Sequence, residues 1–233
     1  MRIYQEADYD AMSRRTAAII AAEVIRKPDC VLGLATGSTP IGAYQQLIEW
    51  YRKGDLSFAE TRTVNLDEYC GLAPTHEQSY RRFMQTNFFD HIDVQPENTH
   101  VPNGLAEDLE AECARYNRVI QELGGIDLQL LGIGHNGHIG FNEPGHTFEL
   151  ETHAVDLSQT TIDANARFFA SREDVPRRAL TMGIKNIMQA RRILVVVSGE
   201  DKAEIVCRAF RGPVTPQVPA SILQLHPDVT LVG

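Results

Sequence analysis

Residues 30–40, CVLGLATGSTP, join an apolar run to a turn of glycine, serine and threonine. The run at 30–35 is apolar throughout, which is typical of a strand buried on both faces of a parallel sheet. Pro40 is suited to the first turn of a helix, because its missing N–H would have no partner there. A buried strand that passes through a glycine turn into a helix is the repeating unit of α/β proteins.

The same alternation continues on both sides of this stretch, with no linker, repeat or low-complexity segment between the units. Apolar residues at helical spacing predict helices at 8–27, 40–53, 77–89, 106–123 and 201–210. Apolar runs predict strands at 30–35, 61–66, 127–133, 191–199 and 229–232. We therefore expect one α/β domain over residues 1–233, a three-layer, Rossmann-like open and mainly parallel sheet with helices on both faces.

Composition excludes several classes of protein. The 233 residues carry 22 Lys and Arg against 31 Asp and Glu, a formal net charge of −9, whereas domains that bind nucleic acid are usually basic. The four cysteines form no CxxC pair and no Cys/His pattern at zinc spacing, which favours reduced thiols over disulfides or structural zinc. No stretch approaches the roughly 18 apolar residues of a membrane helix and the N-terminus has no signal-peptide pattern, so we expect a cytoplasmic protein.

Ligands of open parallel sheets bind at the carboxyl ends of the strands, so the residues after each strand are the first candidates for function. Gly37, Ser38 and Thr39 follow the first strand and precede a helix. Backbone N–H groups and hydroxyls at such a position can hold a phosphate. The lysine of a P-loop is missing, and an ordinary turn with a Ser/Thr cap is the alternative interpretation.

Two carboxylates, Asp67 and Glu68, follow the strand at 61–66. Because successive side chains of an extended chain point to opposite sides, at most one of them should face a ligand. That residue would be a candidate general base, while a helix cap or a solvated turn is the alternative.

The densest motif is LLGIGHNGHIGFNEPG at 130–145, and its residues allow three interpretations. Its glycines match the dinucleotide fingerprint, with Asp156 near the expected offset, but Pro144 and further glycines break the helix that this fingerprint requires. A metal site would use His135, His138 and Glu143 as ligands, with His146 as a fourth. Two histidines at the spacing of His135 and His138 are best aligned by a helix, which the glycines of this motif disfavour. The third interpretation is a general acid/base site in which His138 moves a proton and a neighbouring carboxylate or amide orients its ring.

Five motifs, GLATGSTP, NLDEY, GIGHNGHIGFNEPG, NARFF and LVVVSGEDKA, occur in the order and approximate spacing of glucosamine-6-phosphate deaminases and span residues 33–202. The sequence resembles the short, non-allosteric members of that family. The resemblance implies an enzyme that converts D-glucosamine 6-phosphate and water to D-fructose 6-phosphate and ammonium, with no metal and no organic cofactor.

The resemblance also implies residue roles. His138 would assist opening of the sugar ring, with Glu143 polarising its imidazole, and Asp67 would move the C2 proton to C1. Asn136 stands where several family members carry an aspartate, and an amide adds no charge that could raise the basicity of the histidine. The implied phosphate ligands are Gly37, Ser38, Thr39, Arg167 and Lys202, which would compensate locally for the negative net charge.

Two other functions remain open, a 6-phosphogluconolactonase-like hydrolase and a non-catalytic regulator that senses phosphosugars. A sensor would have no need for Asp67, His138 and Glu143 together. Residues 157–180 resemble the mobile lid of the family. In the larger, hexameric members of the family, basic side chains from the stretch just after the NEP motif bind an activating sugar phosphate at a subunit interface. The corresponding residues 146–155, HTFELETHAV, contain no Lys or Arg, so the resemblance implies no effector site there and a monomer or small homo-oligomer.

Overall fold

The computed structural model describes the backbone of residues 1–233 and every side chain except those of Thr160 and Ala164. The strands are β1 (Arg2–Tyr4), β2 (Val31–Leu34), β3 (Arg62–Asn65), β4 (Asp67–Tyr69), β5 (Thr99–His100), β6 (Leu128–Leu131), β7 (His153–Asp156), β8 (Arg178–Thr181), β9 (Arg192–Val196) and β10 (Val229–Val232). The α-helices are α1 (Tyr9–Arg26), α2 (Ile41–Arg52), α3 (Tyr80–Asn87), α4 (Leu109–Glu122), α5 (Gln159–Asn165), α6 (Ile184–Met188) and α7 (Ala203–Arg211). Short 3-10 helices are η1 (Phe89–His91), η2 (Pro96–Asn98), η3 (Ala166–Phe168), η4 (Arg172–Asp174), η5 (Glu200–Lys202) and η6 (Pro219–Leu225).

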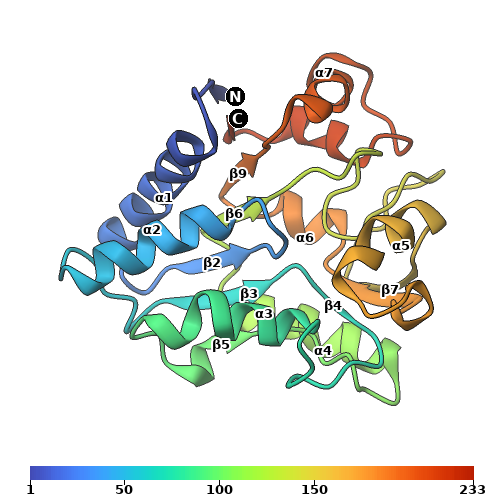
Figure 1. Ribbon diagram of the computed structural model, residues 1–233, viewed down its shortest axis with the longest axis horizontal. Helices are drawn as coiled ribbons and strands as arrows, with labels where there is room; N and C mark the ends of the chain where they lie inside the picture. The colour runs from blue at the N-terminus through green and yellow to red at the C-terminus, as the bar shows by residue number, and fades with distance from the viewer.

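Seven strands form the central sheet in the order β1-β10-β9-β6-β2-β3-β5, and every pair in it is parallel (Figure 1). From β2 the chain continues to β3 on one side, and it later returns to β6 on the other side of β2. Such a reversal opens a crevice at the carboxyl ends of the strands. The two chain termini lie together at the β1 and β10 edge.

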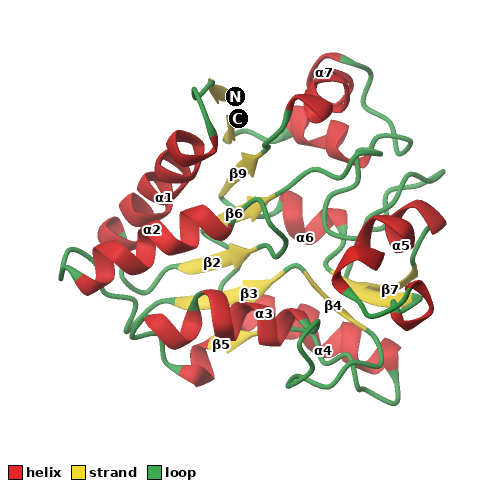
Figure 2. Ribbon diagram, viewed as in Figure 1, coloured by secondary structure: helices red, strands yellow, loops and turns green.

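Helices cover both faces of this sheet, which confirms the predicted α/β architecture (Figure 2). Helices α1, α2 and α3 lie on the near face in the view, and α4 and α6 lie behind the sheet. All five predicted helices and all five predicted strands are present, with their ends shifted by a few residues. The four residues of β2 are buried on both sides, as their apolar character predicts.

A second sheet of three antiparallel strands, β4-β8-β7, stands beside the first and was not among the strands predicted from the sequence. These strands are only three or four residues long and β7 is half exposed, so they lack the apolar run that marks β2. A cluster of buried Tyr69, Phe141, Leu157 and Ala179 packs there, apart from the main core.

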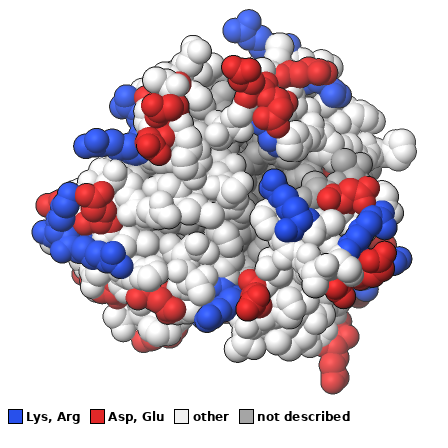
Figure 3. Space-filling view, viewed as in Figure 1, with Lys and Arg blue, Asp and Glu red and all other residues white. Residues whose placement is uncertain are grey.

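Charged side chains of both signs are interspersed around a largely uncharged centre on the face in Figure 3. This distribution agrees with the acidic composition and offers no continuous basic surface on that face. No helix in the described part of the chain combines the length and the apolar character needed to cross a membrane.

Gly33 has a packing role in the middle of β2. A Cβ added to it would lie 2.1 Å from Oε1 of Gln129, a fully buried side chain of the adjacent strand β6. The side chain of Gln129 therefore occupies the space that a residue larger than glycine would need. It is held there by a 2.9 Å hydrogen bond from its Nε2 to the carbonyl of Leu130.

We predict that Gly33→Ala lowers the free energy of unfolding by about 1–3 kcal/mol, the usual cost of overpacking a core, as measured by urea denaturation. Adding Gln129→Ala should recover part of the loss, because the atoms that clash are all beyond the Cβ of Gln129. Gly132→Ala is the control, since a Cβ there has no neighbour within 4 Å. Equal effects of the two glycine substitutions would contradict the steric explanation.

Candidate active site

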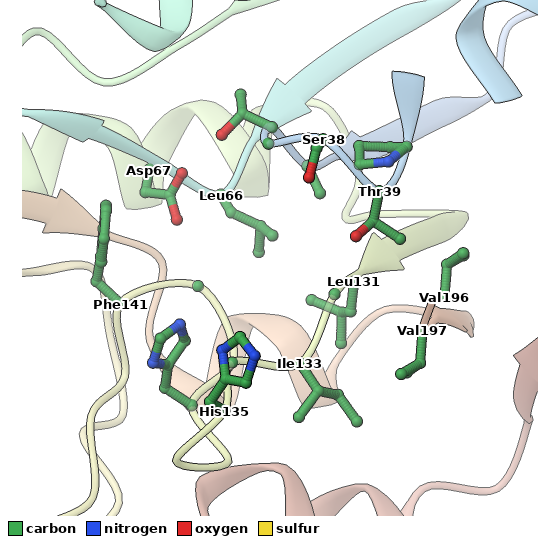
Figure 4. A pocket seen from close by; sticks show the side chains of 18 of the residues that line it. Ser38, Thr39, Leu66, Asp67, Leu131, Ile133, His135, Phe141, Val196 and Val197 are labelled. Atoms are coloured by element: carbon green, nitrogen blue, oxygen red, sulfur yellow. The ribbon is translucent and has the colours of Figure 1, made fainter. Parts of the chain in front are cut away.

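A cavity of about 440 Å³ opens at the carboxyl ends of β2, β3, β6 and β9 (Figure 4). Its walls include apolar side chains from these strand ends, among them Leu66, Leu131, Ile133, Val196 and Val197. The predicted site residues that line it are Gly37, Ser38, Thr39, Asp67, Asn136, His138, Arg167 and Lys202. Glu143 lies behind this wall, in contact with Asn136 and near His138.

The Gly37–Thr39 turn forms one end of the cavity (Figure 4). Gly37 has a φ of 92°, a left-handed conformation that favours glycine. The hydroxyl of Tyr9 donates to the carbonyls of Ser38 and Thr39 at 3.0 and 3.2 Å and accepts from the N–H of Gly42 at 3.0 Å. Sequence reasoning missed Tyr9, because its contact joins residues about thirty positions apart.

Two cations reach the cavity from distant segments of the chain. Arg167 comes from η3, where its guanidinium lies 4.6 Å from the centre of the Phe168 ring. Lys202 is half-buried at the end of η5 and donates through Nζ to the carbonyl of Ile133 at 2.9 Å. Burial lowers the pKa of this ammonium group, and the nearby Asp201 carboxylate partly offsets the effect.

Asp67 is the first residue of β4 and lies one residue beyond the end of β3. The residue between these strands, Leu66, is fixed from both sides, since its N–H donates to the Leu34 carbonyl at 3.2 Å and its carbonyl accepts from the Met182 N–H at 2.7 Å. Asp67 itself pairs with Thr181 of β8. Its carboxylate therefore has a fixed position in the cavity wall, where it is 7% exposed.

The pKa of the Asp67 carboxyl is raised to about 8, first by burial and second by the negative charge of Glu68. Glu68 points away from the cavity and accepts hydrogen bonds from the N–H groups of Tyr69, Tyr80 and Arg81 at 2.8, 2.9 and 2.9 Å. Asp67 lines the cavity and Glu68 does not, as expected for neighbouring residues of a strand, and Glu68 instead accepts hydrogen bonds from the first N–H groups of α3.

His138, Asn136 and Glu143 form a connected group. Nδ1 of His138 lies 3.6 Å from Oε2 of Glu143, and Asn136 donates to the same oxygen at 2.6 Å. The Asn136 side-chain carbonyl also accepts from the backbone N–H of His138 at 3.1 Å, so Asn136 connects Glu143 to the backbone of His138. Gly134 is required beside them, because a Cβ there would lie 2.2 Å from the His138 ring.

Glu143 has the opposite electrostatic environment to Asp67. Burial alone would raise the pKa of its carboxyl, but His138, Thr161 and Asn136 together lower it to about 2. Thr161 donates to Oε1 through its hydroxyl, and Ser158 donates to the same oxygen at 3.2 Å. Neither hydroxyl was predicted, since both come from the start of α5, which carries no motif of its own.

The other interpretations of residues 130–145 are not supported by the backbone. The residues around Gly132, Gly134 and Gly137 form turns, and no helix begins at them as a dinucleotide site requires. Within the described residues, no group of three or more His, Cys, Asp or Glu side chains is arranged to hold a metal ion. The four residues considered as ligands, His135, His138, Glu143 and His146, therefore do not form such a group.

Comparisons with known proteins show the family of this chain. The family model described as glucosamine-6-phosphate isomerases/6-phosphogluconolactonase matches residues 5–232. Glucosamine-6-phosphate deaminase of Lachnoclostridium phytofermentans is 62% identical over 232 residues, covering 100% of this chain and 98% of the relative. That of Geobacillus sp. (strain WCH70) is 55% identical over 233 residues, covering 100% and 93%.

Solved structures of similar fold include a deaminase and a lactonase. A monomeric glucosamine-6-phosphate deaminase superposes with a TM-score of 0.97 at 50% identity, covering 99% of this chain and 96% of that chain. A 6-phosphogluconolactonase from Thermotoga maritima superposes with a TM-score of 0.77 at 20% identity, covering 99% and 97%. At that identity the second protein shares the fold alone.

We predict that Asp67→Asn stabilises the protein increasingly as the pH rises from about 4 to about 8. In this range the folded carboxyl keeps its proton while the unfolded one, with a pKa near the ordinary 3.8, loses it. The native state then binds more protons, so the wild type loses stability with rising pH and the asparagine variant does not. Urea denaturation at several pH values measures the difference.

Glu143→Gln is the control of opposite sign. Its folded pKa is lowered, so the stabilisation from the charged carboxylate is fully present above its unfolded pKa and is lost as the pH falls toward 2. This variant should therefore be destabilised by a constant amount between about pH 6 and pH 8. A pH-independent difference for Asp67→Asn would show that its carboxyl titrates normally.

Proposed function

Since this chain belongs to the glucosamine-6-phosphate deaminase family (EC 3.5.99.6), we propose that it converts D-glucosamine 6-phosphate and water to D-fructose 6-phosphate and ammonium in the cavity described above. One observation carries this proposal. Asp67 and His138, the two groups able to move protons in this reaction, line the same cavity as the Gly37–Thr39 turn, Arg167 and Lys202. A phosphorylated amino sugar needs both sets.

We propose that His138 opens the pyranose ring by moving a proton between O1 and the ring oxygen. Histidine suits this step, because its ordinary pKa lies near neutrality and it can both accept and donate. The ionised Glu143, 3.6 Å from Nδ1, would stabilise the imidazolium that forms. Asn136 would act through Glu143 and the His138 backbone, as a positioning residue with no proton of its own to transfer.

Asp67 would then move the proton from C2 to C1 of the open chain. Free of ligand, this buried carboxyl has a raised pKa, but the substrate carries an ammonium group on the carbon that loses the proton. A cation placed against the carboxyl lowers its pKa and creates the carboxylate where it is needed. Return of the proton at C1 of the enolamine leaves an iminium group at C2, which adds water and releases ammonia.

The phosphate would bind at the other end of the cavity. The N–H groups and hydroxyls of Ser38 and Thr39, together with Arg167 and Lys202, can surround a dianion with donors. Helix α2, which begins at Ile41, adds the positive end of its dipole. These local groups would attract the substrate although the chain has a net charge of −9.

A lactonase-like hydrolase and a phosphosugar sensor are the alternatives. The similarity to a 6-phosphogluconolactonase is 20% identity, far below that to the deaminases, and a sensor has no use for the raised pKa of Asp67.

We also propose that the protein is a monomer with hyperbolic kinetics, and that residues 157–180, of which the last three belong to β8, form a lid. The similar structure of a monomeric deaminase supports the proposed monomer.

The deciding experiment is a coupled assay of fructose 6-phosphate and ammonium formed from glucosamine 6-phosphate. We predict that Asp67→Asn lowers kcat by about 10²- to 10⁴-fold, the usual worth of a general base, and stops exchange of the C2 proton with solvent. His138→Gln should slow the ring-closed substrate more than an open-chain analogue. Wild-type exchange at C2 in Asp67→Asn would remove Asp67 from this role.

For the phosphate, Arg167→Ala and Lys202→Ala should each raise KM for glucosamine 6-phosphate about tenfold or more, the worth of one charge-assisted hydrogen bond. Arg172→Ala is the matched control, because this arginine lies in the same segment but pairs with Asp163 at 2.6 Å outside the cavity. Turnover of unphosphorylated glucosamine should respond to none of them. Unchanged KM in both cavity variants would place the phosphate elsewhere.

A further inference from the structure

His135 and Asp201 join two loops across the mouth of the cavity. Nε2 of His135 lies 2.6 Å from Oδ2 of Asp201, and both residues line the cavity. His135 belongs to the loop after β6, and Asp201 to η5 after β9. Figure 4 shows the His135 ring on the wall beside Ile133, across the cavity from Ser38 and Thr39.

A second contact between the same loops lies next to the first. Lys202, the neighbour of Asp201, donates to the carbonyl of Ile133 at 2.9 Å. The carboxylate of Asp201 and the ammonium of Lys202 are close enough that each influences the pKa of the other. An acidic group therefore stands directly beside the cation expected to bind phosphate.

This arrangement poses an electrostatic problem for an anion. Among the described lining residues only Asp67 and Asp201 are carboxylates, and Asp201 is the one beside Lys202. A carboxylate free to turn would compete with phosphate for that ammonium group and would repel the incoming dianion.

The contacts of Asp201 hold its carboxylate in one orientation. Oδ2 faces His135, while Oδ1 occupies the space over Gly199, where a Cβ would lie only 2.4 Å away. Gly199 has a φ of 104°, so both its conformation and its missing side chain accommodate this orientation. Both carboxylate oxygens are thereby directed at groups other than the Lys202 ammonium.

We propose that His135 is a positioning residue that holds the Asp201 carboxylate away from Lys202 and so keeps this cation available to the substrate phosphate. This inference rests on the proposed function, because it concerns the affinity of that phosphate site. The hydrogen bond from the imidazole to the carboxylate supplies the restraint in either charge state of the ring, and a protonated ring also offsets the charge of Asp201.

The experiment combines His135→Ala, Asp201→Asn and the double variant. Each is measured by KM for glucosamine 6-phosphate, and by the protection that inorganic phosphate gives against thermal unfolding. His135→Ala should raise KM and weaken phosphate binding about two- to fivefold, the range of an exposed ion pair. Asp201→Asn alone should bind phosphate at least as well as the wild type, and the double variant should match Asp201→Asn.

The double variant separates this role from a structural one. If His135 only linked the two loops, adding Asp201→Asn would not restore phosphate binding, because Asp201→Asn weakens the same link that His135→Ala removes. His135→Gln, which keeps a donor, should fall between wild type and His135→Ala. Lys185→Ala is the matched control, since it removes another exposed ion pair, Lys185 Nζ to Glu151 Oε1 at 2.8 Å, outside the cavity. It should leave both readouts unchanged.

An unchanged KM in His135→Ala would overturn the proposal, and so would a double variant as weak as His135→Ala. The phosphate measurement needs no turnover, so this failure is distinct from failure of the proposed function. A wild-type protein that binds phosphate and yields no ammonium would refute the deaminase assignment, and the phosphate binding of the double variant would still decide the role of His135.

Discussion

The buried carboxyl of Asp67 is the constraint on which the rest of the site depends. Burying a carboxylate without a cation is unfavourable, and here a second carboxylate, Glu68, is its chain neighbour. The fold must therefore hold Asp67 against its tendency to reach water. The β4-β8-β7 sheet does this, because pairing with Thr181 and the Met182 hydrogen bond to Leu66 fix the backbone on which Asp67 stands.

Two carboxylates near one cavity acquire opposite properties from their surroundings. Burial favours the protonated form of Asp67, so a cation beside it would be needed to ionise the carboxyl at neutral pH and free it to accept a proton. Glu143 lies among donors from Asn136, Thr161 and Ser158, which keep it charged throughout the physiological range. Such a separation of pKa values lets one site use one carboxyl for proton transfer and another for electrostatic stabilisation.

Sequence reasoning succeeds where one segment carries its own pattern. The apolar run of β2 and the glycine turn after it predict a strand, a turn and a helix, and the strand ends then meet at one edge by topology alone. It fails where the structure depends on distant partners. Residues of β7 are half exposed and show no apolar run, and Thr161 and Tyr9 act only through residues brought near them by the fold.

The chemistry of this fold is set by a few side chains at the strand ends. A 6-phosphogluconolactonase at 20% identity has nearly the same fold, so the seven-stranded sheet by itself selects no reaction. What the sheet supplies is an apolar wall of Leu66, Leu131 and Ile133, and charge interactions beside such a wall are stronger than in bulk water. The side chains of His135 and Asp201, by contrast, are 64% and 63% exposed, so water screens their charges and the proposed restraint on Asp201 changes the affinity of Lys202 for phosphate only a few-fold.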